Sequence, residues 1–475
     1  MKSSKPSVEL IKNIGLFFIA NFLPKAITFF MVPLYTYCLT ADEYGIADLI
    51  YTTVQLLLPI LTLQVQDAML RFTIEKKNDS DSILNVGIRV SIAGTILLIV
   101  GSVICKLIGI IKLETSYLVM FNAIYFANAL RNILSYYCKG LEKIKILTVS
   151  NVLVTVINVI SNLILLLMFK LGVLGYLFSS LLGNVAAIIL MLFVSNLYKH
   201  IKLTTCDKKL TSNILHYSIP LIWSGLAWWI NTSLDKYILG YFYSTAAVGL
   251  MAVAYKIPSI LSLFGGTIAN AYSISAIKEF DLEDKDGFLG KSYATINMCF
   301  VIICSFLMII NIYVFKLLFS KQYFEAWHYV PPLLFSSLMC HMSIICEQYF
   351  IALKRTKVIS VTAIIAAGIN FCTNMLLIPP YGAYGAAIAT AFSFFSVWLI
   401  RYIVLTKKVK LQLKHSITIE CIMYLLLLTQ LIIANWGNKY LTFQILIFIV
   451  IITIYAFAYT KSCIKRGKKN EQKPK

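Results

Sequence analysis

The sequence predicts an all-α polytopic membrane protein with about 14 transmembrane helices, arranged as two pseudo-symmetric six-helix lobes plus two C-terminal helices. Three observations predict this fold class. Hydrophobic residues make up 59% of the 475 residues and charged residues only 13%, whereas soluble domains carry roughly 25% charged residues. The apolar residues form long uninterrupted runs, and runs of about 20 such residues match the hydrocarbon core of a bilayer. Finally, features of the first half recur in the second half.

The apolar runs place the expected helices along the chain. In the first half they cover residues 13–38, 44–71, 83–105, 116–138, 146–169 and 173–198. In the second half they cover 212–240, 246–273, 289–315, 329–352, 358–378 and 383–405, followed by 416–436 and 441–460. We therefore expect an N-terminal six-helix lobe (1–205), a C-terminal six-helix lobe (206–410), and two extra helices with a basic tail (411–475).

The basic residues indicate the orientation in the membrane. The formal net charge is +21, which in a soluble protein would suggest a nucleic-acid partner. Here the lysines and arginines concentrate in the two tails and in every second connection between spans. This alternation fits the positive-inside rule and places both termini in the cytoplasm. We therefore expect membrane lipids, and no nucleic acid, around this chain.

The two halves share a pattern of glycine, tyrosine and asparagine residues. Gly45 and Tyr51 recur 204 residues later as Gly249 and Tyr255, and Asn158 and Asn162 recur 212 residues later as Asn370 and Asn374. Gly172-Val-Leu-Gly175 resembles Gly382-Ala-Tyr-Gly385 in the same order. Because each half holds an even number of spans, both insert in the same orientation. Such parallel repeats are typical of transporters, which bind cargo between the repeats.

Motifs of enzymes and metal sites are missing. The five histidines show no metal-binding spacing, and the 11 cysteines include no CxxC pair. Gly287-Phe-Leu-Gly-Lys-Ser292 is two residues short of a phosphate-binding loop. Asp284-Lys-Asp286 matches the DxD of sugar-nucleotide enzymes, but its acidic surroundings indicate a solvated loop. We therefore expect a protein that is not an enzyme, with no catalytic residue, cofactor or metal.

Charged residues inside the expected spans are the candidate functional residues, because a charge in lipid costs several kcal/mol unless it meets a partner or a cavity. Five cations lie inside the expected spans, and both halves contribute some of them: Lys25, Arg89, Arg131, Lys236 and Lys256. A cavity lined by cations suits an anionic cargo, and phosphate is the natural candidate. We therefore predict that these five residues bind a diphosphate or similar anion.

Acidic residues in the spans have two interpretations, ion coupling or pairing with the cations. Asp67 precedes Arg71 by four residues, so the two share a helix face and are expected to pair. Asp235 adjoins Lys236, and Glu347 is either a coupling site or a salt-bridge partner. The asparagine pairs of the repeat are expected to form hydrogen bonds between helices.

Four segments carry a resemblance to a known family. They are Phe29-Phe-Met-Val-Pro-Leu-Tyr-Thr-Tyr-Cys-Leu-Thr-Ala-Asp-Glu-Tyr-Gly45, Gln66-Asp-Ala-Met-Leu-Arg-Phe72, Lys139-Gly-Leu-Glu142 and Gly382-Ala-Tyr-Gly-Ala-Ala387. With them the chain resembles the Wzx-type polysaccharide flippases of the multidrug/oligosaccharidyl-lipid/polysaccharide exporter superfamily. The first segment is the most specific, and the resemblance covers essentially the whole chain.

This resemblance implies a transporter that works by alternating access between two six-helix lobes. The implied cargo is an undecaprenyl-diphosphate-linked oligosaccharide unit, carried from the cytoplasmic to the outer leaflet of the bacterial inner membrane. The product would serve O-antigen, capsule or exopolysaccharide synthesis, with a polysaccharide polymerase and chain-length machinery as candidate partners. The diphosphate would meet the five cations.

Three alternatives stay open to different degrees. A multidrug antiporter of the same superfamily would be expected to carry an acidic site in its N-terminal half, whereas the deep charge there is Lys25. A flippase for the peptidoglycan lipid precursor has the same fold and the same diphosphate chemistry, so residue chemistry separates it poorly. A membrane enzyme such as a polymerase usually has a large external loop, which the sequence lacks.

Overall fold

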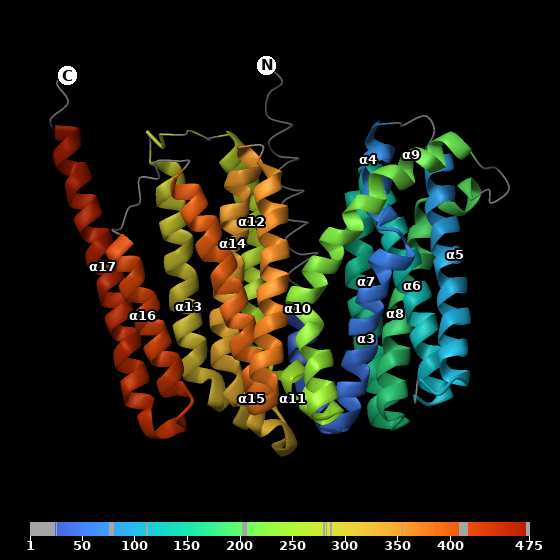
Figure 1. The fold of residues 1–475 in the computed structure, drawn as a ribbon, viewed down its shortest axis with the longest axis horizontal. Helices are drawn as coiled ribbons and strands as arrows, with labels where there is room; N and C mark the ends of the chain where they lie inside the picture. The colour runs from blue at the N-terminus through green and yellow to red at the C-terminus, as the bar shows by residue number, and fades with distance from the viewer. Residues whose placement is uncertain are drawn as a thin grey trace. The chain divides into compact units, whose positions relative to one another are not determined.

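The computed structural model describes residues 24–471, except Lys25 and residues 76–79, 111–112, 202–206, 279–280, 282, 286, 354 and 408–416. The described residues form helices joined by turns and bends, and no strand occurs among them (Figure 1). The predicted all-α fold class is therefore confirmed. The chain divides into two compact units, residues 1–233 and 234–475, with the boundary inside helix α10. The three-part division at 205/206 and 410/411 stays a prediction.

The helices follow the order of the expected spans. The first unit holds α2 (Val32–Cys38), α3 (Ala41–Leu61), α4 (Val65–Glu75), α5 (Ser80–Leu107), α6 (Thr115–Gly140), α7 (Ile144–Asn162), the π-helical η2 (Leu163–Met168), α8 (Gly172–Val194), η3 (Leu197–His200), α9 (Lys208–Ser218), η4 (Ile219–Leu221) and the first part of α10 (Ile222–Phe242). The second unit continues with α11 (Thr245–Ala254), α12 (Pro258–Lys278), α13 (Phe288–Leu318), η5 (Lys321–Tyr329), α14 (Val330–Ala352), α15 (Thr356–Thr406), α16 (Ile417–Ala434), η6 (Gly437–Tyr440) and α17 (Leu441–Glu471).

The length and composition of these helices make the chain a multi-pass membrane protein. Seven described helices are long and apolar enough to cross a membrane, or eight if α11 and α12, bent by 50°, form one span. Shorter apolar helices cover Ala26–Cys38, Thr418–Ala434 and Leu441–Phe457. The helix α15 contains two expected spans, because Gly382 interrupts its helical dihedral angles. Helix α6 coincides with a further expected span, and α10 covers the second part of the expected span 212–240.

The predicted repeat has structural counterparts at the start of the second span of each half. Thr40 and Ser244, which stand 204 residues apart, each cap a helix. The Thr40 hydroxyl accepts a hydrogen bond from the Glu43 N–H at 3.2 Å, and the Ser244 hydroxyl accepts one from the Ala247 N–H at 3.2 Å. Both caps satisfy amides that an isolated helix end leaves without a partner.

The glycine pattern of the repeat also has a physical cause. Gly172 and Gly382 adopt positive φ angles of 54° and 56°, a region that side chains other than glycine rarely enter. A Cβ atom on Gly172 would lie 3.1 Å from the carboxylate of Glu43, and one on Gly382 would lie 3.1 Å from the ring of Tyr243. In each half, therefore, the turn before the sixth span packs against the turn before the second span.

Three expected spans differ from the continuous helices that hydropathy suggests, and one of them, 212–240, is divided among α9, η4 and α10. The span over 44–71 breaks between α3 and α4, where Leu63 and Gln64 adopt φ angles of 52° and 53°. The span over 246–273 breaks between α11 and α12, just before Pro258, whose ring cannot supply a backbone hydrogen bond. Hydropathy averages over such breaks and so cannot detect them.

In the acidic loop before α13, Glu283 and Lys285 are exposed as expected, whereas Asp284 corrects the expected solvated position. Asp284 is only 2% exposed. Its carboxylate accepts hydrogen bonds from the backbone N–H groups of Leu289 at 3.0 Å and Gly290 at 2.9 Å. These amides belong to the first turn of α13 and have no partner within the helix. The carboxylate is therefore buried because it caps α13.

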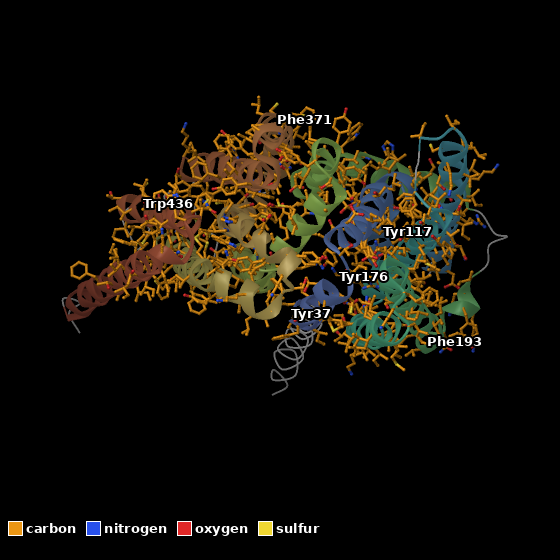
Figure 2. The ribbon with its side chains drawn as sticks, turned by 90° about the horizontal axis from the view of Figure 1, so that it is seen from below. Tyr37, Tyr117, Tyr176, Phe193, Phe371 and Trp436 are labelled. Atoms are coloured by element: carbon orange, nitrogen blue, oxygen red, sulfur yellow. The ribbon has the colours of Figure 1, made fainter. Side chains whose placement is uncertain are left out.

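Large apolar side chains cover the outer faces of both units. Figure 2 looks along the helices and shows Phe193 and Phe371 pointing away from their bundles, whereas Tyr176 lies among the helices of the first unit. Phe193 is 63% exposed, which would be costly in water and is favourable against lipid tails. The outward apolar faces therefore agree with a membrane location.

Candidate functional site

The predicted cations fall in different parts of the chain. Lys25 lies outside the described residues. Arg89 on α5 and Arg131 on α6 belong to the first unit, whereas Lys236 on α10 and Lys256 belong to the second. Arg89, Lys236 and Lys256 are half-buried. A common cavity formed by both units stays a prediction.

Arg131 is held by two amide oxygens from neighbouring helices. Its guanidinium donates to Asn184 Oδ1 on α8 at 2.9 Å and to Asn151 Oδ1 on α7 at 3.0 Å. Its Nε atom is buried without a hydrogen-bond partner, and no described carboxylate forms an ion pair with it. The guanidinium therefore ties three helices together and keeps one donor uncommitted.

We expect Arg131→Met to lower the free energy of unfolding by about 1–3 kcal/mol, because two buried amide oxygens lose charged donors. The measurement is denaturant-dependent unfolding of the purified protein in detergent. Arg71→Met serves as the control, because the Arg71 side chain is 53% exposed and exposed ion pairs contribute about 0–1 kcal/mol. Equal stabilities of the two variants would contradict a structural role for Arg131.

In the second unit, three of the predicted residues gather around Tyr255. Asp235, only 2% exposed, accepts a hydrogen bond from the Tyr255 hydroxyl at 2.8 Å. The Lys236 ammonium lies 5.8 Å from the centre of the Tyr255 ring. Lys256 follows Tyr255 directly and stands in the turn between α11 and α12. Tyr255, at the break of this span, thus lies close to an acid and a cation of α10, and a second cation follows it in the chain.

The expected ion pair between Asp67 and Arg71 is wrong. Arg71 pairs with Glu75 at 2.9 Å, and its guanidinium lies 4.7 Å from the centre of the Tyr217 ring. Asp67 accepts a hydrogen bond from the Gln64 side chain at 2.9 Å instead. Because Gln64 lies in the break between α3 and α4, its side chain is placed within hydrogen-bond distance of Asp67.

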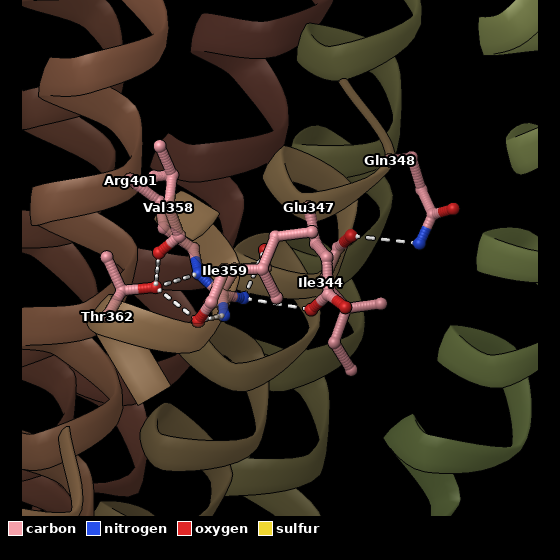
Figure 3. Close-up of polar contacts among 8 residues, drawn as sticks. Ile344, Glu347, Gln348, Val358, Ile359, Thr362 and Arg401 are labelled. Atoms are coloured by element: carbon pink, nitrogen blue, oxygen red, sulfur yellow. Dashed lines mark hydrogen bonds and ion pairs between the residues drawn. The ribbon is translucent and has the colours of Figure 1, made fainter. Parts of the chain in front are cut away.

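Glu347 forms an ion pair that joins α14 to α15. Arg401 donates to Glu347 Oε2 at 3.1 Å, and their side chains are 6% and 30% exposed. The same guanidinium donates to the hydroxyl of Thr362 at 2.9 Å, to the hydroxyl of Ser343 at 2.9 Å and to the carbonyl of Ile359 at 3.4 Å (Figure 3). Arg401 is therefore surrounded by acceptors from two helices, and Glu347 is the one carboxylate among the described residues that pairs with it.

Arg401 is a residue that the sequence reasoning missed. It lies inside the expected span 383–405, so its position in an apolar run was a signal of the same kind as that of Arg89 or Arg131. An acidic residue in another span, Glu347, was the complementary signal. A search for opposite charges in different spans would have identified Arg401 together with Glu347.

The asparagine pairs of the repeat form hydrogen bonds mainly within a helix. Asn162 donates to Asn158 on the same helix, and Asn374 donates to Asn370 Oδ1 at 2.8 Å. Asn162 also donates to the hydroxyl of Tyr35 on α2 at 3.3 Å, which is the expected contact between helices. The two pairs thus share a geometry, and the first pair adds a link to a tyrosine.

A pocket of about 250 Å³ lies in the first unit. It is lined by the first two spans and by α7 and α8, through residues that include Tyr35, Tyr51, Tyr176, Thr155, Asn158 and Ser180. Among the residues that the structure describes, none that lines it carries a charge. Its described lining is therefore polar, aromatic and uncharged, and sequence reasoning did not predict it.

A polar face of α7 connects this pocket to Arg131. Asn151, Thr155, Asn158 and Asn162 follow one another at intervals of four, three and four residues, so they share one face of the helix. Asn151 binds Arg131, and Thr155 and Asn158 line the pocket. On α8, Ser180 lines the pocket and Asn184, one turn further, binds Arg131. The guanidinium thus lies about one helical turn from the pocket.

No group of three or more metal-ligating side chains occurs in the part of the chain that the structure describes. The arrangement offers cations, amides, hydroxyls and aromatic rings. Such groups are able to bind and orient a ligand.

Comparison with known sequences reveals relatives with a membrane function. A family model described as polysaccharide biosynthesis protein matches residues 10–274. The uncharacterized membrane protein MJ1068 of Methanocaldococcus jannaschii is 27% identical over 211 residues, which cover 42% of this chain and 40% of that protein. The probable low-salt glycan biosynthesis flippase Agl15 of Haloferax volcanii is 22% identical over 185 residues, covering 38% and 39%. The chain thus spans about two fifths of the length of the curated relatives it matches.

Solved structures of two transporter types share the fold. The lipid II flippase MurJ in an inward closed conformation matches with a TM-score of 0.73 and 14% identity, over 94% of this chain and 99% of that chain. A multidrug resistance MATE family transporter in an inward-facing conformation matches with a TM-score of 0.64 and 11% identity, over 81% and 94%. At these identities the likeness concerns the fold alone.

Proposed function

Since the chain belongs to the polysaccharide biosynthesis protein family, we propose that it carries a lipid-linked oligosaccharide across a membrane. The observation that carries this proposal is the family match over residues 10–274, which is more than half of the chain. The transporter fold agrees with it, because flippases and exporters share this arrangement of helices. A flippase of glycan biosynthesis among the relatives also favours it.

The cargo in this proposal is an undecaprenyl-diphosphate-linked repeat unit, moved from the cytoplasmic to the outer leaflet of a bacterial inner membrane. The product would enter O-antigen, capsule or exopolysaccharide synthesis, where a polymerase and chain-length proteins would use it. The excess of basic residues in the tails and in every second connection supports cytoplasmic termini. Alternating access of the two lobes would move the sugars past the apolar core of the bilayer.

The cations of the spans are the proposed partners of the diphosphate. Lys25, Arg89, Arg131, Lys236 and Lys256 are the candidates. Lys256 is the best supported of them by its surroundings, because it stands where α11 and α12 bend by 50°. Broken helices in transporters expose backbone groups and side chains to a cavity. A phosphate group is therefore more stable beside a cation at such a site than in the lipid core.

The test is deletion of the gene in its host, followed by analysis of surface polysaccharide and of lipid-linked intermediates. We expect loss of long-chain polysaccharide and accumulation of lipid-linked units that remain in the cytoplasmic leaflet. Normal polysaccharide with altered drug tolerance would overturn the proposal and favour a multidrug antiporter. Arrest of cell-wall synthesis would overturn it in favour of a flippase for the peptidoglycan precursor.

Complementation with Lys256→Ala tests the cationic site in the same strain. We expect about tenfold less long-chain polysaccharide than with the wild type, since the loss of one charged contact to phosphate costs about 1.5–3 kcal/mol. The matched control is Lys199→Ala, which removes the same charge from an exposed position on η3. Equal rescue by both variants at equal protein levels would exclude Lys256 from cargo binding.

A further inference from the structure

The uncharged pocket of the first unit has the features of a carbohydrate subsite. We propose that it binds one uncharged sugar ring of the cargo, with the sugar stacked on tyrosine and its hydroxyls bonded to α7 and α8. The inference rests on the proposed function for the identity of the cargo. It adds a binding site, and a preference for neutral over acidic sugars, that the cationic residues do not provide.

The aromatic rings of the pocket pack against one another. The ring of Tyr176 packs edge-on against Tyr35 at a centroid distance of 4.9 Å and against Tyr51 at 5.8 Å. Tyr44, only 2% exposed, packs behind them at 5.9 Å from Tyr176. Packed tyrosines lose little freedom when a ligand arrives, so they can offer a flat apolar surface at low entropic cost. The C–H face of a sugar ring is an apolar surface of matching shape.

The polar part of the pocket surrounds the rings with hydrogen-bonding groups. Asn158 and Ser180 line it from two helices, and the Tyr51 hydroxyl bonds to Ser180 across the wall. Asn162 bonds to Tyr35 and keeps its Oδ1 atom buried without a hydrogen-bond partner. Hydroxyl and amide groups can both donate and accept, which is what the hydroxyls of a sugar require. A lipid tail would leave these groups without partners.

The charge of the described lining residues favours one class of ligand. Among the lining residues that the structure describes, none is a lysine, arginine, aspartate or glutamate, and Arg131 is held outside this lining by Asn151 and Asn184. A phosphate or uronic acid placed there would lose water without gaining an opposite charge from these residues. Its volume of about 250 Å³ is slightly below the usual range for drug-sized ligands, about 300–1,000 Å³, and suits a single ring. The anionic part of the cargo therefore belongs elsewhere, and one sugar belongs here.

The second unit buries the residue that corresponds to Asn158. Asn370 and Asn374, which correspond to Asn158 and Asn162, are 1% and 0% exposed. Tyr255, which corresponds to Tyr51, commits its hydroxyl to Asp235. In the first unit, Asn158 and Tyr51 are only half-buried and line the pocket. The asparagine of the repeat is thus accessible at position 158 and buried at position 370.

The experiment measures sugar binding by purified protein in detergent, with saturation transfer from the protein's aromatic protons to sugars at millimolar concentration. The probes are glucose and N-acetylglucosamine as neutral sugars and glucuronate as an acidic one. We expect transfer to at least one neutral sugar and about tenfold less to glucuronate. Stronger transfer to glucuronate, or no transfer to any of the three, would overturn the inference.

Two variants test whether the saturation-transfer signal comes from sugar bound in the pocket. Tyr51→Leu removes an aromatic face, and Ser180→Leu fills the cavity while it leaves every ring in place. We expect either change to weaken binding about tenfold, as the loss of a stacking contact should. Tyr37→Leu is the matched control, because Tyr37 lies on the same helix as Tyr35 and is 78% exposed. Binding that persists in both pocket variants would also overturn the inference.

The outcome is separate from that of the gene deletion. A polysaccharide defect with no sugar binding would remove the pocket and keep the proposed function. Sugar binding without a polysaccharide defect would keep the pocket and remove the proposed function.

Discussion

Arg401→Met is expected to destabilise the protein by about 3–5 kcal/mol, the cost of removing one partner of a buried ion pair. The substitution removes the guanidinium contacts to Glu347, Thr362 and Ser343. It leaves the Glu347 carboxylate, 30% exposed, without its cation inside the bundle. The measurement is the free energy of unfolding of purified protein, obtained by denaturant titration in detergent.

Two further variants make the Arg401 prediction specific. Arg355→Met removes an exposed arginine just before α15 and is expected to change stability by less than about 0.5 kcal/mol. The double variant Arg401→Met with Glu347→Met is expected to recover part of the loss, because no isolated charge remains. A double variant less stable than the sum of the single changes would show that the carboxylate has a second role. The ion pair would then have a role in addition to stabilising the fold.

Gly385→Ala is expected to destabilise the protein by about 1–3 kcal/mol through overpacking. A Cβ atom there would lie 2.0 Å from the carbonyl oxygen of Leu377, so backbone must move. In the first half, a Cβ on the corresponding Gly175 would meet no atom closer than 3.1 Å. We therefore expect Gly175→Ala to cost clearly less, although the two glycines occupy the same place in the repeat.

Gly368→Ala on the same helix is the control for Gly385→Ala. No heavy atom lies within 4 Å of a Cβ at Gly368, and alanine favours a helix over glycine by about 0.8–1.0 kcal/mol. Thermal unfolding of the three variants should therefore rank Gly368→Ala highest, Gly175→Ala next and Gly385→Ala lowest. Similar midpoints for the Gly175 and Gly385 variants would contradict the prediction, because the backbone around Gly385 would then adjust to a Cβ atom as easily as the surroundings of Gly175.

Much of the fold could be predicted from the sequence because the signals are local. Apolar runs of membrane-spanning length predict helices without knowledge of their neighbours. The glycines at 172 and 382 belong to a motif that recurs in the sequence, and both adopt positive φ. The breaks after α3 and α11 were missed, because an average over an apolar run does not record where its hydrogen bonds stop.

The candidate site could be predicted only in part. Sequence reasoning selected the cations of the spans as candidates, because a charged residue can be recognised among apolar neighbours in the sequence alone. It paired Arg71 with Asp67, whereas the structure pairs it with Glu75. It missed Arg401, whose partner Glu347 is 54 residues away. It also missed the tyrosine pocket, whose lining comes from four separate spans.

The sequence by itself determined the all-helical membrane architecture, the division into two similar halves and the family. These follow from hydropathy, helical length and repeated motifs, which are properties of neighbouring residues along the chain. Only the tertiary structure decided that Arg131 lies between Asn151 and Asn184 and that Tyr35, Tyr51 and Tyr176 surround one pocket. Such contacts depend on how each helix is rotated about its axis and where it breaks. Packing of whole helices sets both, and no short segment encodes either.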